Sequence, residues 1–564
     1  MDSIFGYSKG HRLSVIEEQI TCKGINVLCQ DVLIAIFEYL PLSDRVRIER
    51  VSRLWRRLSK QSYGKQKALC LNRKFLGLKC NDNYDLSNAI DCMVLEHILK
   101  RCGRYLKSID LTHVHYRNAL SYVAEYCSDV RIIKFNGTTP QDIEKLSKKC
   151  KNIEQLFVND IIISSAYDEP LGNLFCSCKS LRTLELSLCE FRGQCFSKLS
   201  ASEIQRLKIV SFCTSAEYMD VNFLKNAAGI KWLEISGYGS VIATALESLS
   251  VRSTNVTELA LEVYNRPEES GASYLTDADM LLSRVFERNK GIASLRLASF
   301  KSLKGTCLLR LNGICLKELF LYDCVDNIGD KLLGDCLSKF EQLESLELRD
   351  FPAERTFTNT LECVSLLKNL KNFSLNNVEV ESEVALMNVV KSLKRLKSLT
   401  VIGPRVGIVT DRFCAFLVEY LPQISKVDFS YNDLITDGGI QFIVQLKNLQ
   451  VLNLVECANI TGSGLICSSE LKELNLAGCT NLKEQPLIQM FEREHALELV
   501  NLSGFRGEPR ENYDLEEPMI RFMASEESAE KIVQIAIDSF YSSEIKCHDC
   551  MTIYTCFRVF HLWR

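Results

Sequence analysis

The residues best suited to metal chemistry lie near the C-terminal end of the chain. Residues 547–550 read Cys-His-Asp-Cys, and Cys556 and His561 follow. Thiolates and imidazoles are the usual ligands of zinc, and a Cys-x-x-Cys pair can supply two of them. The second pair has no recognised ligand spacing, and an apolar dipeptide at 559–560 lies inside it. We therefore predict no metal site, and the ligands are too few for a RING-type site.

Sequence motifs of catalytic sites are no better represented than those of metal sites. Cys547 has no activating base nearby in the sequence, which a cysteine nucleophile needs. The histidines, including His113 and His115, form no H-E-x-x-H pattern, and the sequence has no G-x-x-x-x-G-K-[ST] loop for a nucleoside triphosphate. The sequence therefore predicts a non-catalytic protein without a cofactor.

Composition and charge argue against other classes of function. The chain has 68 basic and 71 acidic residues and a formal net charge of −3, which favours neither nucleic-acid nor membrane binding. Residues 45–67 are basic, but the solvated outer faces of helices explain that charge better than a nucleic-acid site does. The first 15 residues lack the apolar stretch of a signal peptide, and no apolar run predicts a transmembrane helix. We expect a cytoplasmic and/or nuclear protein whose 25 cysteines are reduced.

A repeated pattern dominates the chain and supplies the elements that position any site. L-x-x-L-x-L recurs from residue 106 to residue 502 with a mean period of about 26 residues, inside the range of roughly 20–29 for leucine-rich repeats. Sixteen copies align on their fourth position, at Ile109, Ile133, Leu156, Leu184, Leu207, Leu233, Leu259, Leu295, Leu319, Leu346, Phe373, Leu399, Val427, Leu452, Leu474 and Val500. Each copy predicts a short strand followed by a helix, and stacked neighbours share one continuous core.

A second buried row is expected five residues after each aligned position. It contains Cys189, Cys324, Cys457, Cys479, Phe212, Phe300, Phe351, Phe505, Tyr238 and Tyr264. Apolar residues at helical spacing between Leu321 and Leu343, and Thr436 as a helix cap, predict helices between the strands. The segment from Leu452 to Thr461 resembles the cysteine-containing class of leucine-rich repeat.

Two segments depart from this period. Turn-forming and acidic residues at 265–273 predict a surface loop, extending over about 265–280, inserted into one repeat. Such a loop can carry a binding function or be merely tolerated. The tail beyond residue 505 is polar at first and then predicts a helix from Glu527 to Tyr541. We expect the tail to cap the last repeat or to fold back over the concave face.

The segment before the repeats carries more large apolar residues than so small a module can bury. Three helices are expected, from a cap at Asp31 to Leu40-Pro41, from a cap at Ser43 or Asp44 to Arg50, and from about Arg53 to Tyr63. The surplus apolar side chains should dock onto a partner.

Residues 27–58 closely resemble the F-box. The matching residues are Leu28, Asp31-Val-Leu33, Ile36-Phe37-Glu-Tyr-Leu40-Pro41-Leu42, Val51, Arg53 and Trp55-Arg56-Arg57-Leu58. Cys29 departs from the family, which usually has proline there. The resemblance implies docking onto the adaptor subunit of a cullin scaffold. The adaptor-binding residues that it implies are Leu28, Leu33, Ile36, Phe37, Leu40, Pro41, Leu42, Val51 and Trp55. The alternative is that these residues form only the core of a helical cap on the solenoid.

Together, the two resemblances suggest an F-box/leucine-rich-repeat protein. Its implied fold is α/β, a small helical F-box followed by a curved solenoid with a parallel sheet inside and helices outside. The expected segments are a disordered extension at 1–26, the F-box at 27–70, linking helices at 71–104, about sixteen repeats at 105–505 and a cap or tail at 506–564. The implied function is substrate recognition in an SCF-type ubiquitin ligase, within ubiquitin-dependent protein degradation. The alternative is a scaffold or inhibitor that acts outside any ligase.

The concave side of the repeats is where a protein substrate is expected. In L-x-x-L-x-L, the residue between the last two leucines and the residue after them point to that side. Most such positions are small or polar, at Ser187, Ser236, Ala298, Ser374, Thr400, Asn453, Asn475 and Ala477. The middle repeats differ, with Arg296, Phe320, Tyr322, Glu347 and Arg349.

Aromatic and arginine side chains dominate interface energetics, and arginine binds carboxylates and phosphates bidentately. We predict that these five residues bind an acidic or phosphorylated segment of the substrate, with Trp232 as a further candidate. The alternative is that Phe320 and Tyr322 pack under the C-terminal tail.

Overall fold

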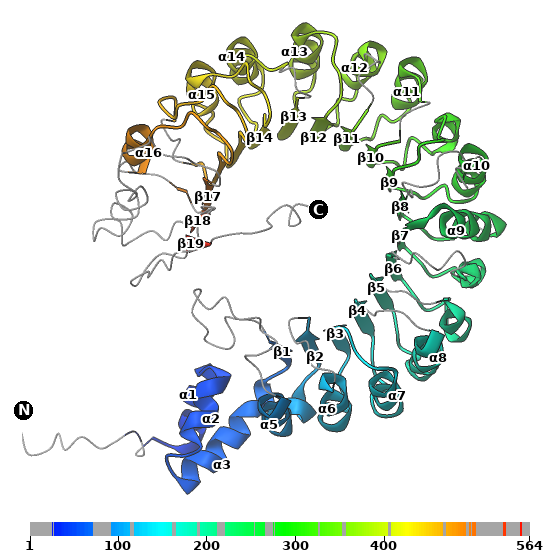
Figure 1. The fold of residues 1–564 in the computed structure, drawn as a ribbon, viewed down its shortest axis with the longest axis vertical. Helices are drawn as coiled ribbons and strands as arrows, with labels where there is room; N and C mark the ends of the chain where they lie inside the picture. The colour runs from blue at the N-terminus through cyan, green and yellow to red at the C-terminus, as the bar shows by residue number, and fades with distance from the viewer. Residues whose placement is uncertain are drawn as a thin grey trace, which may run out of the picture.

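The computed structural model describes residues 25, 28–71, 92–112, 118–160, 165–188, 192–210, 220–252, 254–264, 275, 277–324, 328–351, 357–403, 408–465, 470–491, 496–497, 499–502, 534–536 and 553–554. A small helical module stands at the N-terminal end of a long curved parallel sheet (Figure 1). The strands line the inside of the curve and the helices form its outer rim. The fold class expected from the sequence is confirmed.

The N-terminal module, residues 28–65, contains three α-helices and a short 3-10 helix. They are α1 (Gln30–Tyr39), α2 (Leu42–Ile48), α3 (Arg53–Ser62) and η3 (Tyr63–Lys65). Helix α1 ends as predicted, because proline holds the preceding residue, Leu40, in an extended conformation. The third helix is also confirmed, and the Ser52 hydroxyl caps it by accepting a hydrogen bond from the Trp55 amide at 3.1 Å.

The caps predicted for the first two helices are wrong. Cys29 is the N-cap residue of α1, with no side-chain cap, and Asp31 lies within the first turn. Pro41 is the N-cap residue of α2. Helix α2 therefore starts directly after the proline, ahead of the residues expected to cap it, and it ends at Ile48 rather than Arg50.

Within the described residues the sheet has 19 strands, each parallel to the next in chain order. The strands are β1 (Ala68–Cys70), β2 (Ser108–Leu111), β3 (Ile132–Asn136), β4 (Gln155–Asn159), β5 (Thr183–Ser187), β6 (Arg206–Val210), β7 (Trp232–Tyr238), β8 (Glu258–Tyr264), β9 (Ser294–Ala298), β10 (Glu318–Tyr322), β11 (Ser345–Arg349), β12 (Asn372–Asn376), β13 (Ser398–Ile402), β14 (Lys426–Asp428), β15 (Val451–Asn453), β16 (Glu473–Asn475), β17 (Leu499–Asn501), β18 (Gln534–Ala536) and β19 (Ile553–Tyr554).

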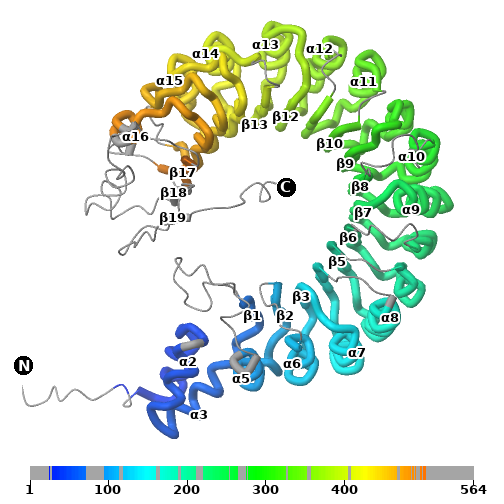
Figure 2. Tube along the Cα trace, in the orientation of Figure 1, coloured from blue at the N-terminus to red at the C-terminus, as the bar shows by residue number. Residues whose placement is uncertain are grey.

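Helices cover the outer side of this sheet, as the trace in Figure 2 also shows. The α-helices are α5 (Cys92–Cys102), α6 (Ala119–Tyr126), α7 (Pro140–Lys149), α8 (Asp168–Ser177), α9 (Gly239–Val251), α10 (Ala278–Arg288), α11 (Asp330–Leu337), α12 (Thr358–Val364), α13 (Glu383–Ser392), α14 (Asp411–Tyr420), α15 (Asp437–Ile443) and α16 (Glu484–Phe491). The 3-10 helices are η5 (Gly103–Tyr105), η6 (Ser165–Tyr167), η7 (Gln194–Lys198), η8 (Asn222–Asn226) and η9 (Thr306–Arg310). The predicted cap at Thr436 is confirmed, since its side chain accepts a hydrogen bond from the Gly438 amide.

The strand register confirms the repeat alignment. The sixteen aligned positions lie opposite one another from β2 to β17, for example Leu295 opposite Leu319 and Leu319 opposite Leu346. All sixteen side chains are buried. The structure adds β1 ahead of them, where Leu69 lies opposite Ile109. Sequence analysis missed this strand because residues 68–70 carry no full copy of the pattern.

A left-handed residue ends most of these strands. The residue four positions after the aligned leucine has a positive φ in many repeats, including Ser299, Asp323 and Asp350. The turn redirects the chain, so that the next residue enters the core. Cys324, Cys457, Cys479, Phe300 and Phe351 are buried there, which confirms this part of the second row, whereas Cys189, Phe212 and Phe505 lie outside the described residues.

The second row is wrong at Tyr238 and Tyr264. Strands β7 and β8 lack the left-handed turn, so each continues to its tyrosine. Both rings are half-buried and lie on the same face of their strands as the concave residues. Their centroids are 6.4 Å apart in an edge-to-face arrangement. The β-branched Val263, which disfavours the left-handed conformation, stands at the turn position of β8, and Gly237 stands at the same position of β7.

Acidic residues at the starts of helices join successive repeats. Asp437 accepts hydrogen bonds from the amides of Thr461, Gly462 and Gly464, at 3.0–3.1 Å, at the corresponding point of the next repeat. Asp330 accepts from two amides of α12 in the same way. Amides that a helix or turn leaves without a partner are therefore satisfied by the preceding repeat.

Predictions for the two irregular segments need correction. Residues 534–536, placed in a helix by the sequence, form strand β18, which continues the sheet beyond β17. Residues 278–280, placed in the inserted loop, belong to α10. Most of the remaining loop and tail, including the Cys-His cluster at 547–561, lies outside the described residues.

Candidate functional site

The predicted adaptor-binding residues differ in how far their side chains are exposed to solvent. Leu28, Pro41 and Val51 are exposed, and Val51 keeps 61% of its surface accessible. Ile36, Leu40 and Trp55 are half-buried and pack around the small core of the module. Leu33 and Phe37 form that core with Leu58, and Leu42 is buried in the separate core of the solenoid. Leu33, Phe37 and Leu42 are therefore core residues in this structure rather than surface residues.

Three exposed apolar residues in or just before the module were missed by sequence analysis. They are Ile25, Val32 and Tyr39, and Tyr39 keeps 91% of its surface accessible. Val32 and Tyr39 lie seven residues apart on α1, which is close to two helical turns and places them on one face, whereas Leu28 precedes the helix. This spacing was a usable signal, but Val32 and Tyr39 lay outside the set of residues that we carried over from the family.

A buried polar joint attaches the module to the solenoid. Glu49, at 6% exposure, accepts two hydrogen bonds from the Arg101 guanidinium of α5, at 2.8 and 3.0 Å, and one from the Tyr63 hydroxyl at 3.0 Å. The pKa of Arg101 is raised, mainly by the hydrogen bond to Glu49. Arg45, also buried, donates to the carbonyls of Leu40 and Ser62. The Arg45 bonds lie within the module, whereas the bond pair from Arg101 to Glu49 links the module to α5 and so to the repeats.

The structure brings the five predicted concave residues together on β9, β10 and β11. Arg296 and Glu347 lie on either side of Phe320, and Arg349 lies beside Tyr322. The Arg296 guanidinium carbon is 4.9 Å from the centre of the Phe320 ring and 5.9 Å from that of Tyr322. Both arginines are exposed, and both rings are half-buried.

The polar side chains of this cluster have different partners. Arg349 forms an ion pair with Asp350 at 3.2 Å. The pKa of Tyr322 is raised well above its ordinary value, chiefly because the hydroxyl is shielded from solvent, and further because of the charge and hydrogen bond of Glu347. Tyr322 is therefore a neutral hydrogen-bonding group at physiological pH.

Trp232, the further candidate, lies in a second concave cluster on β5–β7. The Arg206 guanidinium stacks over its ring at 3.7 Å and forms an ion pair with Glu185 at 2.8 Å. Lys208 pairs with Glu234 at 2.8 Å beside them. These cations are already neutralised within the protein.

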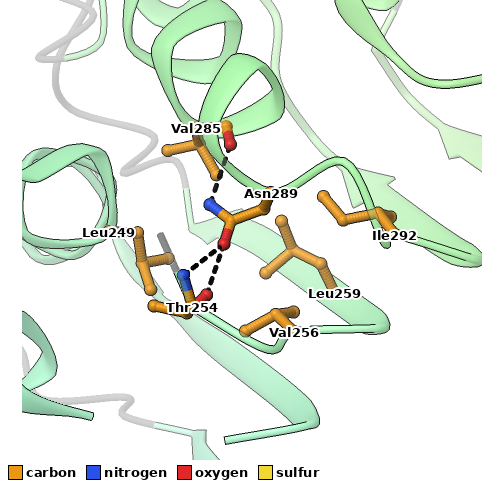
Figure 3. A pocket seen from close by; sticks show the side chains of 7 residues that line it. All are labelled: Leu249, Thr254, Val256, Leu259, Val285, Asn289 and Ile292. Carbon is orange, nitrogen blue, oxygen red and sulfur yellow. Dashed lines mark hydrogen bonds between the residues drawn. The ribbon is translucent and has the colours of Figure 1, made fainter. Parts of the chain in front are cut away.

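The cavity in Figure 3 lies in the core between α9, β8 and α10 and has no space for a water molecule. Its polar residue, Asn289, accepts hydrogen bonds from the amide and hydroxyl of Thr254 and donates to the Val285 carbonyl at 2.8 Å. The cavity is thus a packing feature rather than a ligand site. Among the residues that the structure describes, no helix is long and apolar enough to cross a membrane, and no cluster of three or more potential metal ligands occurs.

Comparisons with known proteins gave matches to the N-terminal module and to most of the chain. Residues 25–63 match the family model described as F-box-like. A Caenorhabditis elegans protein, EEED8.10, provisionally named as an RNA-binding protein, is 25% identical over 434 residues, which is 73% of this chain and 51% of the relative. The chain therefore spans about half the length of that relative. The crystal structure of the Rad7–Elc1 complex of yeast matches over 83% of this chain and 94% of that chain, with 12% identity and a TM-score of 0.35.

Proposed function

We propose that this protein is a non-catalytic receptor subunit of a cullin-based ubiquitin ligase. The F-box-like module binds the adaptor subunit, and the concave face of the repeats holds a protein substrate. The chemistry is then proximity, because a substrate lysine held near an activated thioester has a high effective concentration.

The observation that carries this proposal is the F-box-like module at residues 25–63, with apolar side chains left exposed and a buried joint behind it. Exposed apolar residues on a small module favour a protein partner. The joint from Glu49 to Arg101 supports a fixed orientation of that partner relative to the repeats.

The alternative is a repeat scaffold or inhibitor that never enters a ligase. It would use the concave face in the same way, with the module serving only as a cap on the first repeat. Adaptor binding separates the two functions, since a cap has no need of exposed Leu28, Pro41 and Val51 side chains.

The decisive experiment is affinity purification of the full chain beside a variant carrying Leu28→Ala, Pro41→Ala and Val51→Ala. The three side chains are exposed and lie outside the core of Leu33, Phe37 and Leu58. Because Pro41 also ends α1, circular dichroism of the variant checks that the helices of the module are retained. We expect adaptor and cullin to be lost from the purified complex, since interface hot spots cost about 2 kcal/mol or more each on truncation. Proteins retained by both forms are substrate candidates.

A matched control variant carries Ile314→Ala, Leu366→Ala and Val384→Ala, three exposed apolar residues of the solenoid. It should bind the adaptor as the unmodified chain does. Adaptor affinity that is unchanged in the module variant would reject the ligase function and favour the scaffold.

A further inference from the structure

We propose that Arg296 binds an anionic side chain of the substrate, a carboxylate or a phosphate, on the concave surface formed by β8, β9 and β10. This inference rests on the proposed receptor function and names the chemical class of segment that the concave face accepts. The partner is an extended protein segment in which the anion is followed or preceded by an apolar or aromatic residue.

The first argument is the pairing of cations on the concave face. Arg206, Lys208 and Arg349 each have a carboxylate within 3.2 Å. Within the described part of the chain, Arg296 has no carboxylate partner, although it is exposed. Lys134 on β3 shares this property and contacts the Phe157 ring, but its ammonium cannot form a planar bidentate pair.

The second argument is the position of the Arg296 guanidinium. Its carbon lies 4.9 Å from the centre of the Phe320 ring and 5.9 Å from that of Tyr322, within the range of a cation–π contact. Such a contact leaves N–H donors of the guanidinium for the two oxygens of a carboxylate or phosphate. Contact with the rings also restricts the side chain before the ligand arrives, which reduces the entropy lost on binding.

The third argument is the space beside Arg296. Its register neighbour on β8 is Ala260, opposite the side occupied by Phe320 on β10. Ala298, the next concave residue of β9, lies between Glu262 and Tyr322. Small side chains on this side leave the edge of the guanidinium accessible, whereas the half-buried rings of Phe320 and Tyr322 offer an apolar contact for a neighbouring residue.

A protein segment fits this arrangement better than RNA does. Binding to a nucleic-acid backbone requires several cations that are available to neutralise successive phosphates. The cations on the neighbouring strands are paired internally, and Glu347 and Glu262 flank the cluster. A single available arginine beside two aromatic rings is suited to one anionic side chain.

The test uses the full chain purified with its adaptor and an immobilised array of 15-residue peptides with degenerate flanks. The central residue is Asp, Glu, phosphoserine or phosphotyrosine, with Asn, Gln, Ser and Tyr as neutral counterparts. We expect acidic or phosphorylated centres to bind about tenfold or more tightly than their neutral counterparts, as for a charge-assisted bidentate pair. The ratio of carboxylate to phosphate binding distinguishes the two sources of the anion.

The selected peptide is then titrated against Arg296→Ala, Arg296→Lys and Arg206→Ala. Alanine at 296 should remove the preference for the anion, and lysine should restore only part of it, because lysine lacks the bidentate geometry. Arg206→Ala is the matched control, since Arg206 also stacks on an aromatic ring but is ion-paired. It should change the affinity less than twofold.

Equal binding of neutral and anionic peptides, an unchanged affinity in Arg296→Ala, or no peptide selected at all would each overturn the inference. So would an RNA 15-mer that binds more tightly than any peptide and depends on Arg296. Adaptor binding is measured in the same preparations. A variant that keeps the adaptor but loses the peptide leaves the receptor function intact, whereas loss of adaptor binding by the unmodified chain counts against the proposed function alone.

Discussion

The N-terminal module and the solenoid differ in the size of their apolar cores. The module's own core consists of Leu33, Phe37 and Leu58, with half-buried neighbours around them. The solenoid has one continuous core that begins with Leu42 and Tyr63 of the module and extends to Leu502. The repeats are therefore stabilised by their neighbours, whereas the module depends on its joint and, by our proposal, on its partner.

Each region therefore tolerates change at different positions. In the solenoid, each buried leucine contacts layers before and behind it, so damage to one repeat affects a long stretch of core. In the module, the exposed apolar side chains contribute little to its core, so changing them should cost little stability.

Leu346→Ala, at the centre of the sheet, should give the largest loss of stability. Leu346 is buried between Leu319 and Phe373 on the adjacent strands, so truncation leaves a cavity that the stacked repeats cannot easily close. The free energy of unfolding of the solenoid should fall by about 2–5 kcal/mol. Urea unfolding followed by circular dichroism measures it.

The matched change in the module is Leu58→Ala, which should abolish adaptor binding and leave the main unfolding transition of the solenoid in place. If Leu58→Ala lowered that transition as much as Leu346→Ala does, the two cores would be one cooperative unit and the contrast would fail.

Glu49→Ala should weaken the attachment of the module to the repeats, which the burial of Leu42 and Tyr63 in the solenoid core also holds. The change leaves the Arg101 guanidinium without its bidentate partner in a largely buried setting, at a cost of about 2–4 kcal/mol. Limited proteolysis should cleave between α3 and α5 faster than in the unmodified chain. Glu49→Gln is the control, because its amide oxygen still accepts from Arg101 or Tyr63, and its cleavage rate should be intermediate. Equal cleavage rates in all three forms would show that the joint does not hold the module.

Asp437→Asn should have a smaller and pH-dependent effect. Burial of Asp437 acts to raise its pKa, but hydrogen bonds from Thr461 and Gly464 outweigh burial, so the folded pKa is lowered. A lowered pKa stabilises the fold above the unfolded value, near 3.9, and this contribution is lost as pH falls through the folded value.

At pH 7 the Asn variant should therefore unfold about 1–2 kcal/mol more easily than the unmodified chain. The gap between their unfolding free energies should close below about pH 4, since the protonated aspartate no longer accepts as strongly. A gap that is constant from pH 7 to pH 3 would contradict the assignment to this carboxylate.

The buried cysteines should show the smallest effect of all. Burial raises the pKa of Cys336 and of Cys479 to about 11, so neither thiol is ionised at pH 7.5. Iodoacetamide labelling of the native protein, read by peptide mass spectrometry, should modify exposed Cys29 and Cys176 well before these two. Mild reductants and chelators should leave the thermal transition unchanged, and a drop of several degrees with a chelator would reveal a metal site that we did not predict.

Much of the solenoid could be predicted from the sequence because the repeat period follows from the packing of each repeat on the next. Each aligned residue has to face the core of the next repeat, so Leu295, Leu319 and Leu346 fall in register without knowledge of the structure. The concave residues follow from the same alternation, which is why Arg296 and Tyr322 were placed together correctly. Their role in substrate binding stays a prediction.

The features that the sequence did not predict depend on contacts between distant residues. Leu42 stays a predicted adaptor-binding residue, but its burial in the solenoid core depends on how the module packs on the repeats. The joint between Glu49 and Arg101 joins residues 52 positions apart and had no local signal. Strand β1 is short and pairs with β2, and its own sequence carries only part of the repeat pattern.

The left-handed residue that ends most of these strands decides on which side of the sheet the next side chain lies. Non-glycine residues with φ near +55° are disfavoured, and asparagine and aspartate bear this conformation best, whereas valine resists it. At Val263 the chain runs straight on, and the ring of Tyr264 lies on the concave side rather than in the core. Gly237, opposite Val263 on β7, tolerates either conformation, and its strand also runs straight, to Tyr238. The backbone conformation at this one position, and not the residue type alone, therefore sets whether an aromatic ring is a core residue or a contact on the concave face.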